Sequence, residues 1–336
     1  MTKHYTIPIF VPELACPFQC VFCNQEKISG HRNIPGRNEI INTIENYLVT
    51  FKSKERFVEV GFFGGNFTGI PIDEQKYYLE IVKPYINSGV IEGIRLSTRP
   101  DYINEDILRI LKKNNVTTIE LGAQSFDDDV LHKSSRGHTA AQIEIASKMI
   151  LEHGFKLGLQ MMIGLPGDTL EKAMYTACKI IESGAQESRI YPTLVIRDTA
   201  LHVMHKQQKY KPLSLEQAVD WTKRIIPLFE DAGVTLIRIG LHPSDGLVSG
   251  DELVDGPFHS SFKELVISSI WADLLSPLLS NKTYKNIEIH VPAKEINYAI
   301  GHGSVNRKML LEKFNSVKFI PDSYILTRNF RLKSID

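Results

Sequence analysis

Apolar and polar residues follow two alternating patterns along the chain. Short apolar runs, typical of buried strands, are followed by longer stretches in which apolar residues recur every three or four positions, as on one face of a helix. The predicted strands cover residues 5–11, 57–63, 93–97, 117–122, 156–163 and 189–192. The predicted helices cover residues 38–51, 73–86, 105–113, 140–153 and 170–183, and a sixth helix over 215–232 leads to a strand over 235–239. Gly154 and Gly184 each follow a helical stretch immediately, as expected where a helix ends.

This repeated order of strand and helix is that of a parallel α/β sheet. Six such units predict a partial (β/α)6 barrel of the TIM type, in which functional groups gather where the strands end. We assign residues 1–240 to this core barrel, residues 241–280 to a connecting lid segment, and residues 281–336 to a small α/β appendage.

Composition excludes some classes of protein. Apolar residues make up 43% of the 336 residues, which is enough for a sizeable core. Lys and Arg together number 39, as do Asp and Glu, so the overall charge does not attract nucleic acid or membrane. The first residues lack the apolar core of a signal peptide, and no apolar run approaches the ~20 residues of a spanning helix. We therefore expect a cytoplasmic protein without a membrane partner.

The appendage differs in charge from the rest of the chain. Residues 281–336 contain ten Lys or Arg and five Asp or Glu, a local excess of five positive charges. Such an excess is compatible with binding to the phosphates of RNA. Solvated surface lysines are the simpler explanation, and the sequence leaves both open.

Three of the four cysteines, Cys16, Cys20 and Cys23, fall within eight residues just after the first predicted strand. Three thiolates on one loop can ligate three irons of a [4Fe–4S] cluster, whereas a closed cluster takes four. The fourth iron would then have an open position for a small molecule. Cys178 stands alone on a predicted helix and is interpreted as a small buried apolar residue.

Two alternatives to a cluster, a zinc site and disulfides, have less support in the sequence. A structural zinc site requires a fourth Cys or His, and only His4 and His31 flank the loop, so a site of three Cys and one His stays open. A disulfide between two of the three cysteines would leave the third thiol unpaired. Disulfides are also typical of secreted proteins, and nothing in the sequence indicates secretion.

The C-x₃-C-x₂-C spacing, with Phe22 before the last cysteine, resembles the signature of radical S-adenosylmethionine (SAM) enzymes. The resemblance implies the barrel type of that superfamily, a [4Fe–4S] cluster on Cys16, Cys20 and Cys23, and SAM chelated by the open iron. It implies that the reduced cluster cleaves SAM to methionine and a 5′-deoxyadenosyl radical. An external one-electron reductant, such as flavodoxin or ferredoxin, would supply the electron. We place Phe22 among the residues that contact the cofactor.

Further motifs extend this resemblance along the barrel. Gly64, Gly65 and Asn66 end the second strand where the superfamily has a Gly-Gly-Glu/Thr element that contacts the SAM amino group. Asn66 departs from that pattern, and a Gly pair alone is often a simple turn. Ser97 and Arg99 end the third strand and share one face, because strand side chains alternate. They are predicted to meet SAM if that face is the lumen; the alternative is a capping Ser and a surface Arg.

The fourth and fifth units are similar to oxygen-independent coproporphyrinogen III oxidase and to the catalytic subunit of Elongator. By motif match, Gln124 and Arg136 are expected beside SAM, with Arg136 pairing its carboxylate. The fifth strand carries the Gly-Leu-Pro-Gly turn at 164–167, and Gln160 stands where relatives place a polar residue, frequently Asp, toward the adenosine.

The sixth strand resembles the Elongator branch in particular. Arg189 and Tyr191 share one face, and if it is the inner one they approach the radical carbon. We predict them as the catalytic pair: Tyr191 to relay a hydrogen atom or orient substrate, and Arg189 to hold an anionic group. A core tyrosine with a satisfied hydroxyl is the alternative for Tyr191.

These observations predict a radical SAM enzyme that removes hydrogen from its substrate. The Elongator likeness and the basic appendage favour RNA as substrate, tRNA in particular. Elongator has wider spacing between its first two cluster cysteines and an acetyltransferase domain, and we expect neither here. Two alternatives stay open: a radical SAM enzyme that acts on a porphyrin or another small metabolite, and a non-catalytic zinc or iron–sulfur module that binds RNA.

Overall fold

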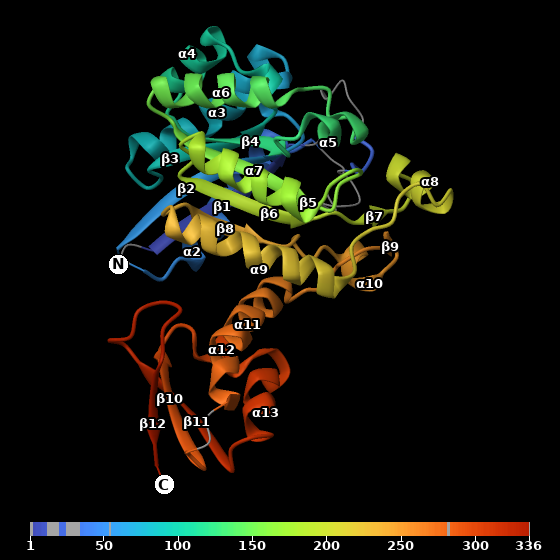
Figure 1. Cartoon of the computed structure of the whole chain (residues 1–336). Coiled ribbons are helices and arrows are strands. Elements are labelled where there is room, and N and C mark those ends of the chain that lie inside the picture. The colour runs from blue at the N-terminus through green and yellow to red at the C-terminus, as the bar shows by residue number, and fades with distance from the viewer. Residues whose placement is uncertain (1–2, 12–19, 25–33, 54, 281–282, 336) are drawn as a thin grey trace. The chain divides into compact units, whose positions relative to one another are not determined.

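The computed structural model describes residues 3–11, 20–24, 34–53, 55–280 and 283–335. It divides into two compact units (Figure 1). The first comprises residues 1–214 and 225–258, and the second comprises residues 215–224 and 259–336. The boundaries predicted at residues 240 and 280 stay a prediction.

The first unit is built on one parallel sheet of seven strands in the order β1-β2-β3-β4-β5-β6-β8. The strands are β1 (Lys3–Val11), β2 (Arg56–Gly64), β3 (Gly93–Thr98), β4 (Val116–Gln124), β5 (Lys156–Ile163), β6 (Glu187–Pro192) and β8 (Thr235–Ile239). Because each strand pairs with the one before it in the same direction, every connection crosses over, and most contain a helix. The sheet curls into a half-barrel, which confirms the predicted fold class (Figure 1).

The connections carry the predicted helices and several shorter elements. The long helices are α2 (Arg37–Thr50), α3 (Ile72–Asn87), α4 (Glu105–Lys113), α6 (Ala140–Glu152), α7 (Leu170–Glu182) and α9 (Leu215–Asp231). The sequence pattern did not predict α5 (Asp128–Lys133), α8 (Ala200–Lys206), α10 (Asp245–Ser249), or the short strands β7 (Val195–Ile196) and β9 (Leu253–Asp255). Each of these spans at most two turns of helix or three strand residues, which is too short to show a regular spacing of apolar residues.

Local chemistry explains where these helices begin. In α6 the Thr139 hydroxyl accepts from the Gln142 N–H, while the Gln142 side chain accepts from the Thr139 N–H, a complete capping box. Helices α7 and α4 have a simpler cap: the side-chain oxygens of Thr169 and Asn104 each accept one N–H of the first helical turn.

One prediction about α7 is wrong. Cys178 is exposed rather than buried. The buried face of α7 consists of Ala173, Thr176, Ala177 and Ile180, and position 178 lies about 100° further round the helix from position 177.

The strands of the half-barrel have one apolar and one polar face. In β3, buried Ile94 and Leu96 alternate with Arg95 and Ser97. Arg95 bonds to Glu187 on β6, three strands away. A flat sheet would hold those strands about 14 Å apart, so the polar side chains must project into the concave side of a curled sheet. The apolar face packs against helices, and the concave face is left for polar chemistry.

The second unit is a small α/β structure. Its sheet has the order β11-β10-β12, from β10 (Asn286–Pro292), β11 (Ser316–Asp322) and β12 (Arg331–Ser334). Its helices are α11 (Phe262–Leu275), α12 (Ile296–Ile300) and α13 (Val305–Leu311), together with residues 215–224 of α9. Buried Asn306 donates to the carbonyl oxygens of Ser268 and Ala299, which ties α13 to its neighbours.

Within the part of the chain that the structure describes, every helix is too short or too polar to cross a bilayer.

Candidate functional site

The cysteine loop follows β1, and the structure describes its last part. Cys20 is buried and Cys23 is half-buried, whereas Cys16 lies outside the described residues. The Cys23 N–H donates to the Cys20 carbonyl oxygen at 2.9 Å, which closes a tight turn between the two cysteines. In the described residues no three Cys, His, Asp or Glu side chains gather as metal ligands. The predicted cluster therefore depends on Cys16 in addition to this turn.

The residues between these cysteines are anchored from two sides. The Val21 N–H donates to the Ser134 carbonyl oxygen at 3.2 Å, and the Val21 carbonyl oxygen accepts from the Leu201 N–H at 2.6 Å. Val21 packs with Val195, Leu201 and Tyr210, and Phe22 packs against this group. Phe22 therefore helps to fix the loop in position; a contact with a cofactor stays a prediction.

Arg136 is brought next to the cysteine turn. Its Nη1 lies 3.1 Å from the Cys20 Sγ, and its Nη2 donates to the Gly122 carbonyl oxygen at 2.5 Å. The backbone carbonyl of Arg136 accepts from Arg99 Nη2 at 2.7 Å. The sequence alternative that made Arg99 a surface residue is wrong, since Arg99 is 2% exposed and also bonds to both carboxylate oxygens of Asp101.

The Gly-Gly-Asn segment closes the carboxyl ends of β1 to β3. Gly64 has φ +133°, and a Cβ at this position would lie 1.8 Å from the Val11 carbonyl oxygen, so only glycine fits. Gly65 follows at the end of the strand. The Asn66 Oδ1 accepts from the Thr98 hydroxyl at 2.6 Å and from the Arg99 N–H at 3.3 Å.

Four buried polar atoms in this region have no hydrogen-bond partner among the described residues. They are Asn66 Nδ2, Gln124 Oε1, Arg136 Nε and His138 Nδ1. Each unpaired buried polar group costs about 1–3 kcal/mol. The Arg136 and Gln124 side chains both lie beside Gly122, and His138 bonds to the Ala123 carbonyl oxygen through its Nε2. Two of these atoms are donors and two are acceptors, and Arg136 carries one of the donors beside the cysteine turn.

The surroundings of His138 determine its charge state. Burial, together with the positive charges of Arg136 and Arg99, lowers the pKa of His138 to about 3. The imidazole is therefore neutral near pH 7. Because its Nε2 donates to a carbonyl, its Nδ1 is a hydrogen-bond acceptor.

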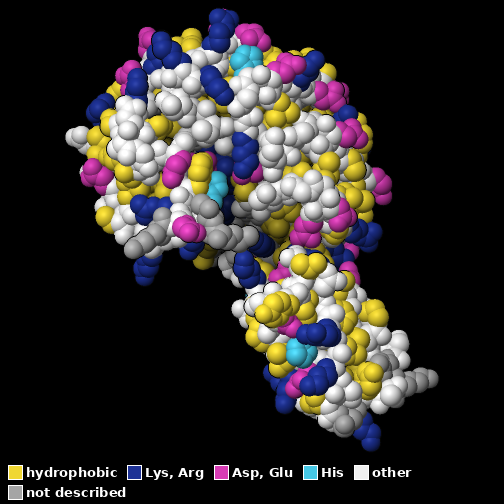
Figure 2. Space-filling view, turned by 90° about the vertical axis from the view of Figure 1, so that its left-hand side faces the viewer, with side chains coloured by type: hydrophobic (Ala, Val, Ile, Leu, Met, Phe, Trp, Pro, Cys, Tyr) yellow, Lys and Arg dark blue, Asp and Glu magenta, His cyan; other side chains and the backbone are white. Residues whose placement is uncertain are grey.

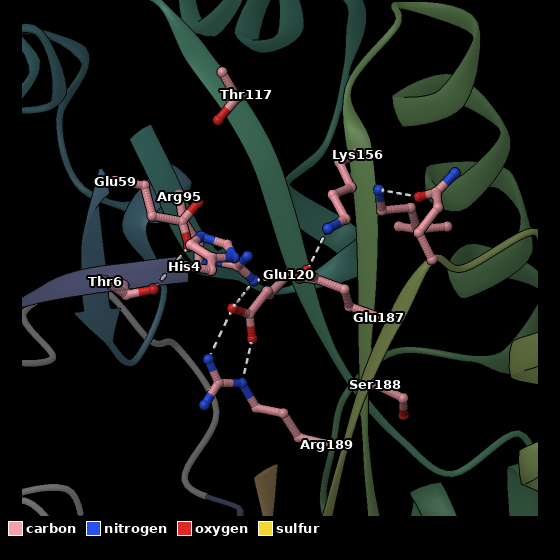
Figure 3. A network of polar contacts seen from close by, with 12 residues as sticks. His4, Thr6, Glu59, Arg95, Thr117, Glu120, Lys156, Glu187, Ser188 and Arg189 are labelled. Atoms are coloured by element: carbon pink, nitrogen blue, oxygen red, sulfur yellow. Dashed lines mark hydrogen bonds and ion pairs between the residues drawn. The ribbon is translucent and has the colours of Figure 1, made fainter. Parts of the chain in front are cut away.

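A charged layer fills the concave face of the sheet below these groups. Figure 3 shows carboxylates and guanidinium groups converging there from different strands. Arg95 donates to Glu59 at 2.5 Å, to Glu120 at 2.7 Å and to Glu187 at 2.6 Å. Glu187 also pairs with Lys156. Arg95 and the three carboxylates are each at most 2% exposed, so this network is almost completely removed from water.

Glu120 joins this charged layer to the predicted catalytic pair. Its two oxygens accept from Arg189 Nε at 2.6 Å and Nη2 at 2.9 Å (Figure 3). Burial acts to raise the pKa of Glu120, but the neighbouring charges of Arg189 and Arg95 outweigh it and leave the pKa below its ordinary value. Glu120 is therefore a permanent anion that orients Arg189.

Arg189 in turn reaches Tyr191. Its Nη1 lies 3.4 Å from the Tyr191 hydroxyl, and its guanidinium lies 5.3 Å from the centre of the Phe63 ring. Gln160 lies within 3.5 Å of the Ser97 hydroxyl and 3.3 Å of Glu120. The structure thus places Ser97, Gln160, Arg189 and Tyr191 on one connected network.

Sequence reasoning missed the part played by Glu120. Glu120 stands in β4 between buried Ile119 and Leu121, and a charged residue there is almost never fully buried without a partner. A charged residue inside a buried strand, with Arg95 likewise inside the neighbouring strand β3, was the available signal.

Another carboxyl, that of Asp168, lies in the turn after β5. Burial raises the pKa of Asp168 to about 7, against the hydrogen bonds from the Gly164 and Thr169 N–H groups. The Tyr210 hydroxyl donates to the Gly164 carbonyl oxygen at 2.6 Å, so the same turn is also fixed from the segment that follows α8.

Fold and site together define a class of protein: a parallel half-barrel whose cysteine loop follows β1 and ends beside the carboxyl ends of its neighbours. Figure 2 shows a hollow in the first unit, with Lys or Arg and His side chains exposed around it. A sequence model of the radical SAM superfamily matches residues 13–177, and one of the radical SAM C-terminal domain matches residues 185–272. The chain belongs to the radical SAM superfamily and is an enzyme of that class.

Individual relatives confirm the resemblance to Elongator. Elongator complex protein 3 of Dictyostelium discoideum is 29% identical over 191 residues, covering 51% of this chain and 34% of the relative. The tRNA uridine(34) acetyltransferase of Methanocaldococcus jannaschii is 26% identical over 293 residues, covering 75% of this chain and 52% of the relative. The chain thus spans about a third to a half of the length of these relatives.

Solved structures support the fold. The archaeal Methanocaldococcus infernus Elp3 with an N-terminal deletion matches with a TM-score of 0.65 at 20% identity, covering 80% of this chain and 63% of that one. Streptococcus suis SuiB bound to S-adenosylmethionine matches with a TM-score of 0.52 at 15% identity, covering 79% and 55%.

Proposed function

We propose that this radical SAM enzyme binds a [4Fe–4S] cluster through Cys16, Cys20 and Cys23, cleaves SAM reductively, and acts on tRNA. The carrying observation is the position of Arg136, whose Nη1 contacts the Cys20 sulfur while its buried Nε has no hydrogen-bond partner among the described residues. When bound and reduced, such a cluster supplies the electron that splits SAM and so yields a 5′-deoxyadenosyl radical.

The chain's own residues bind and orient the cofactor in this proposal. The amide of Asn66 and the guanidinium of Arg136 supply donors for the amino-acid part of SAM. Gln124 supplies an acceptor, and Ser97 and Gln160 present polar groups further into the lumen. Arg99 acts through its bonds to Asp101 and to the Arg136 carbonyl, which hold the Arg136 loop in place.

Arg189 and Tyr191 are proposed to face the substrate. Because Glu120 occupies two of the three guanidinium nitrogens of Arg189, the remaining nitrogen can fix the Tyr191 oxygen. The tyrosine O–H is then free to donate to substrate or to transfer its hydrogen.

The first test of the function is SAM cleavage. Anaerobically reconstituted protein, reduced with dithionite, is expected to form 5′-deoxyadenosine and methionine from SAM even without substrate, as quantified by chromatography. An Asn66→Ala variant should bind SAM more weakly, with its iron content unchanged. A reduced, iron-loaded protein that forms no 5′-deoxyadenosine would contradict the proposal and favour a zinc or iron–sulfur module without catalysis.

The tRNA proposal rests on the names of the curated relatives and on the basic appendage, residues 281–336. Arg307 and Lys308 are exposed on α13, and Lys313 follows just beyond it, also exposed. Phosphate contacts release condensed counterions, so tRNA affinity should fall as salt rises.

Replacing Arg307 and Lys308 together by Ala is expected to weaken tRNA binding and to flatten the salt slope by about one unit per lost contact. Filter binding at several salt concentrations measures both. The control variant, Arg109→Ala with Lys113→Ala, removes two exposed charges from α4. If the unaltered protein retains no tRNA at physiological salt, a porphyrin or another small metabolite replaces tRNA as the proposed substrate.

A further inference from the structure

The contact between Arg136 and Cys20 is unusual because it joins a guanidinium to a predicted cluster ligand. The 3.1 Å separation of Nη1 and Sγ is short for a hydrogen bond to sulfur. Arg136 is 6% exposed and Cys20 is 5% exposed. Water therefore screens this charge little, and its effect on the sulfur is large compared with that of a surface arginine.

The two partners are held together from several sides. The Gly122 carbonyl oxygen accepts from the other terminal nitrogen of Arg136, and Arg99 binds the Arg136 carbonyl. On the cysteine side, the Val21 N–H is bonded to the Ser134 carbonyl oxygen, two residues before Arg136. The loop at 134–136 thus fixes the cysteine turn through its backbone and contacts the cysteine sulfur through its arginine.

We propose that Arg136 sets the reduction potential of the cluster by donating an N–H to the Cys20 sulfur and by placing a positive charge beside it. The inference rests on the proposed function, since it requires the cluster on Cys16, Cys20 and Cys23. It differs from a carboxylate-binding role for Arg136, because it acts in the absence of SAM.

The direction of the effect follows from charge. Reduction adds one negative charge to the cluster, which a nearby cation and a hydrogen bond to a ligand sulfur both stabilise. Arg136 therefore raises the potential and makes the cluster easier to reduce. Loss of the guanidinium leaves more of the cluster oxidised at a given reductant strength.

The experiment is a redox titration of the reconstituted full chain without SAM, followed by electron paramagnetic resonance of the reduced cluster. For Arg136→Gln we expect the reduction equilibrium to shift about tenfold toward the oxidised cluster, which is about 59 mV for a one-electron couple. Arg136→Lys, which keeps the charge but not the planar donor geometry, should shift it less. Arg109→Gln, which removes an equal charge from an exposed position on α4, should leave it unchanged.

Each outcome has one meaning. A potential in Arg136→Gln equal to that of Arg109→Gln overturns the inference, and weaker SAM binding with an unchanged potential assigns Arg136 to SAM alone. If Arg136→Gln does not hold iron, Arg136→Met, which also removes the charge and the N–H donor, takes its place, and a potential there equal to that of Arg109→Gln overturns the inference. A wild-type chain that binds no cluster contradicts the proposed function instead.

Discussion

Replacing Cys16, Cys20 or Cys23 singly by Ala is expected to abolish the cluster. After anaerobic reconstitution the unaltered chain should carry about four irons and four sulfides with a visible chromophore. Each of these variants should lose the chromophore, because two thiolates on one loop do not hold a cubane that already lacks a fourth ligand. Iron and sulfide analysis with the visible spectrum measures the loss.

Cys178→Ala is the matched control, since it changes the same residue type at an exposed position of α7. It should retain iron, sulfide and colour. Bleaching in Cys178→Ala equal to that in the loop variants would replace the open-iron site with a closed four-cysteine cluster. Full colour in all three loop variants would leave no role for the motif.

The second large effect is expected from Arg95→Met. The substitution leaves Glu59, Glu120 and Glu187 buried and close together without the cation that joins them. Removing one partner of a buried ion pair costs about 3–5 kcal/mol, and we expect a loss of unfolding free energy in that range. Urea denaturation followed by circular dichroism measures it.

Two further variants make the result specific. Arg109→Met removes an arginine whose pair with Asp106 is largely exposed, and such pairs contribute little. Adding Glu59→Gln to Arg95→Met should restore part of the stability, because it neutralises a buried carboxylate that has lost its arginine and keeps only His4 and Thr6 as partners among the described residues. Equal stability of Arg95→Met and Arg109→Met would show that the charged layer does not hold the half-barrel together.

The long elements were predictable because burial of one face makes apolar residues recur at a regular spacing along the sequence. The predicted helix over 105–113 and strand over 156–163 match α4 and β5 residue for residue. The cysteine loop and the glycine pair were found for a different reason, because their chemistry depends on neighbours in the sequence. Helix α5 and strand β7 contain too few residues to show such a spacing.

The partners of buried charges could not be read from the sequence. Arg99 was open to a surface interpretation because its partners include a backbone carbonyl 37 residues away. Cys178 was misplaced because a helical stretch indicates that a face is buried, but a lone cysteine does not mark which face. Such assignments depend on curvature and register, which the tertiary fold sets.

The bond between Arg95 and Glu187 also bears on the order in which the chain can fold. The two residues are 92 positions apart, and Glu120 and Lys156 lie between them in sequence. During synthesis, β2 to β5 emerge while part of their charge is still without its partner. Contacts this distant in sequence form late. We therefore expect the charged layer to be completed only once β6 has been synthesised, so that the strands made before it depend on β6 for the last partner of Arg95.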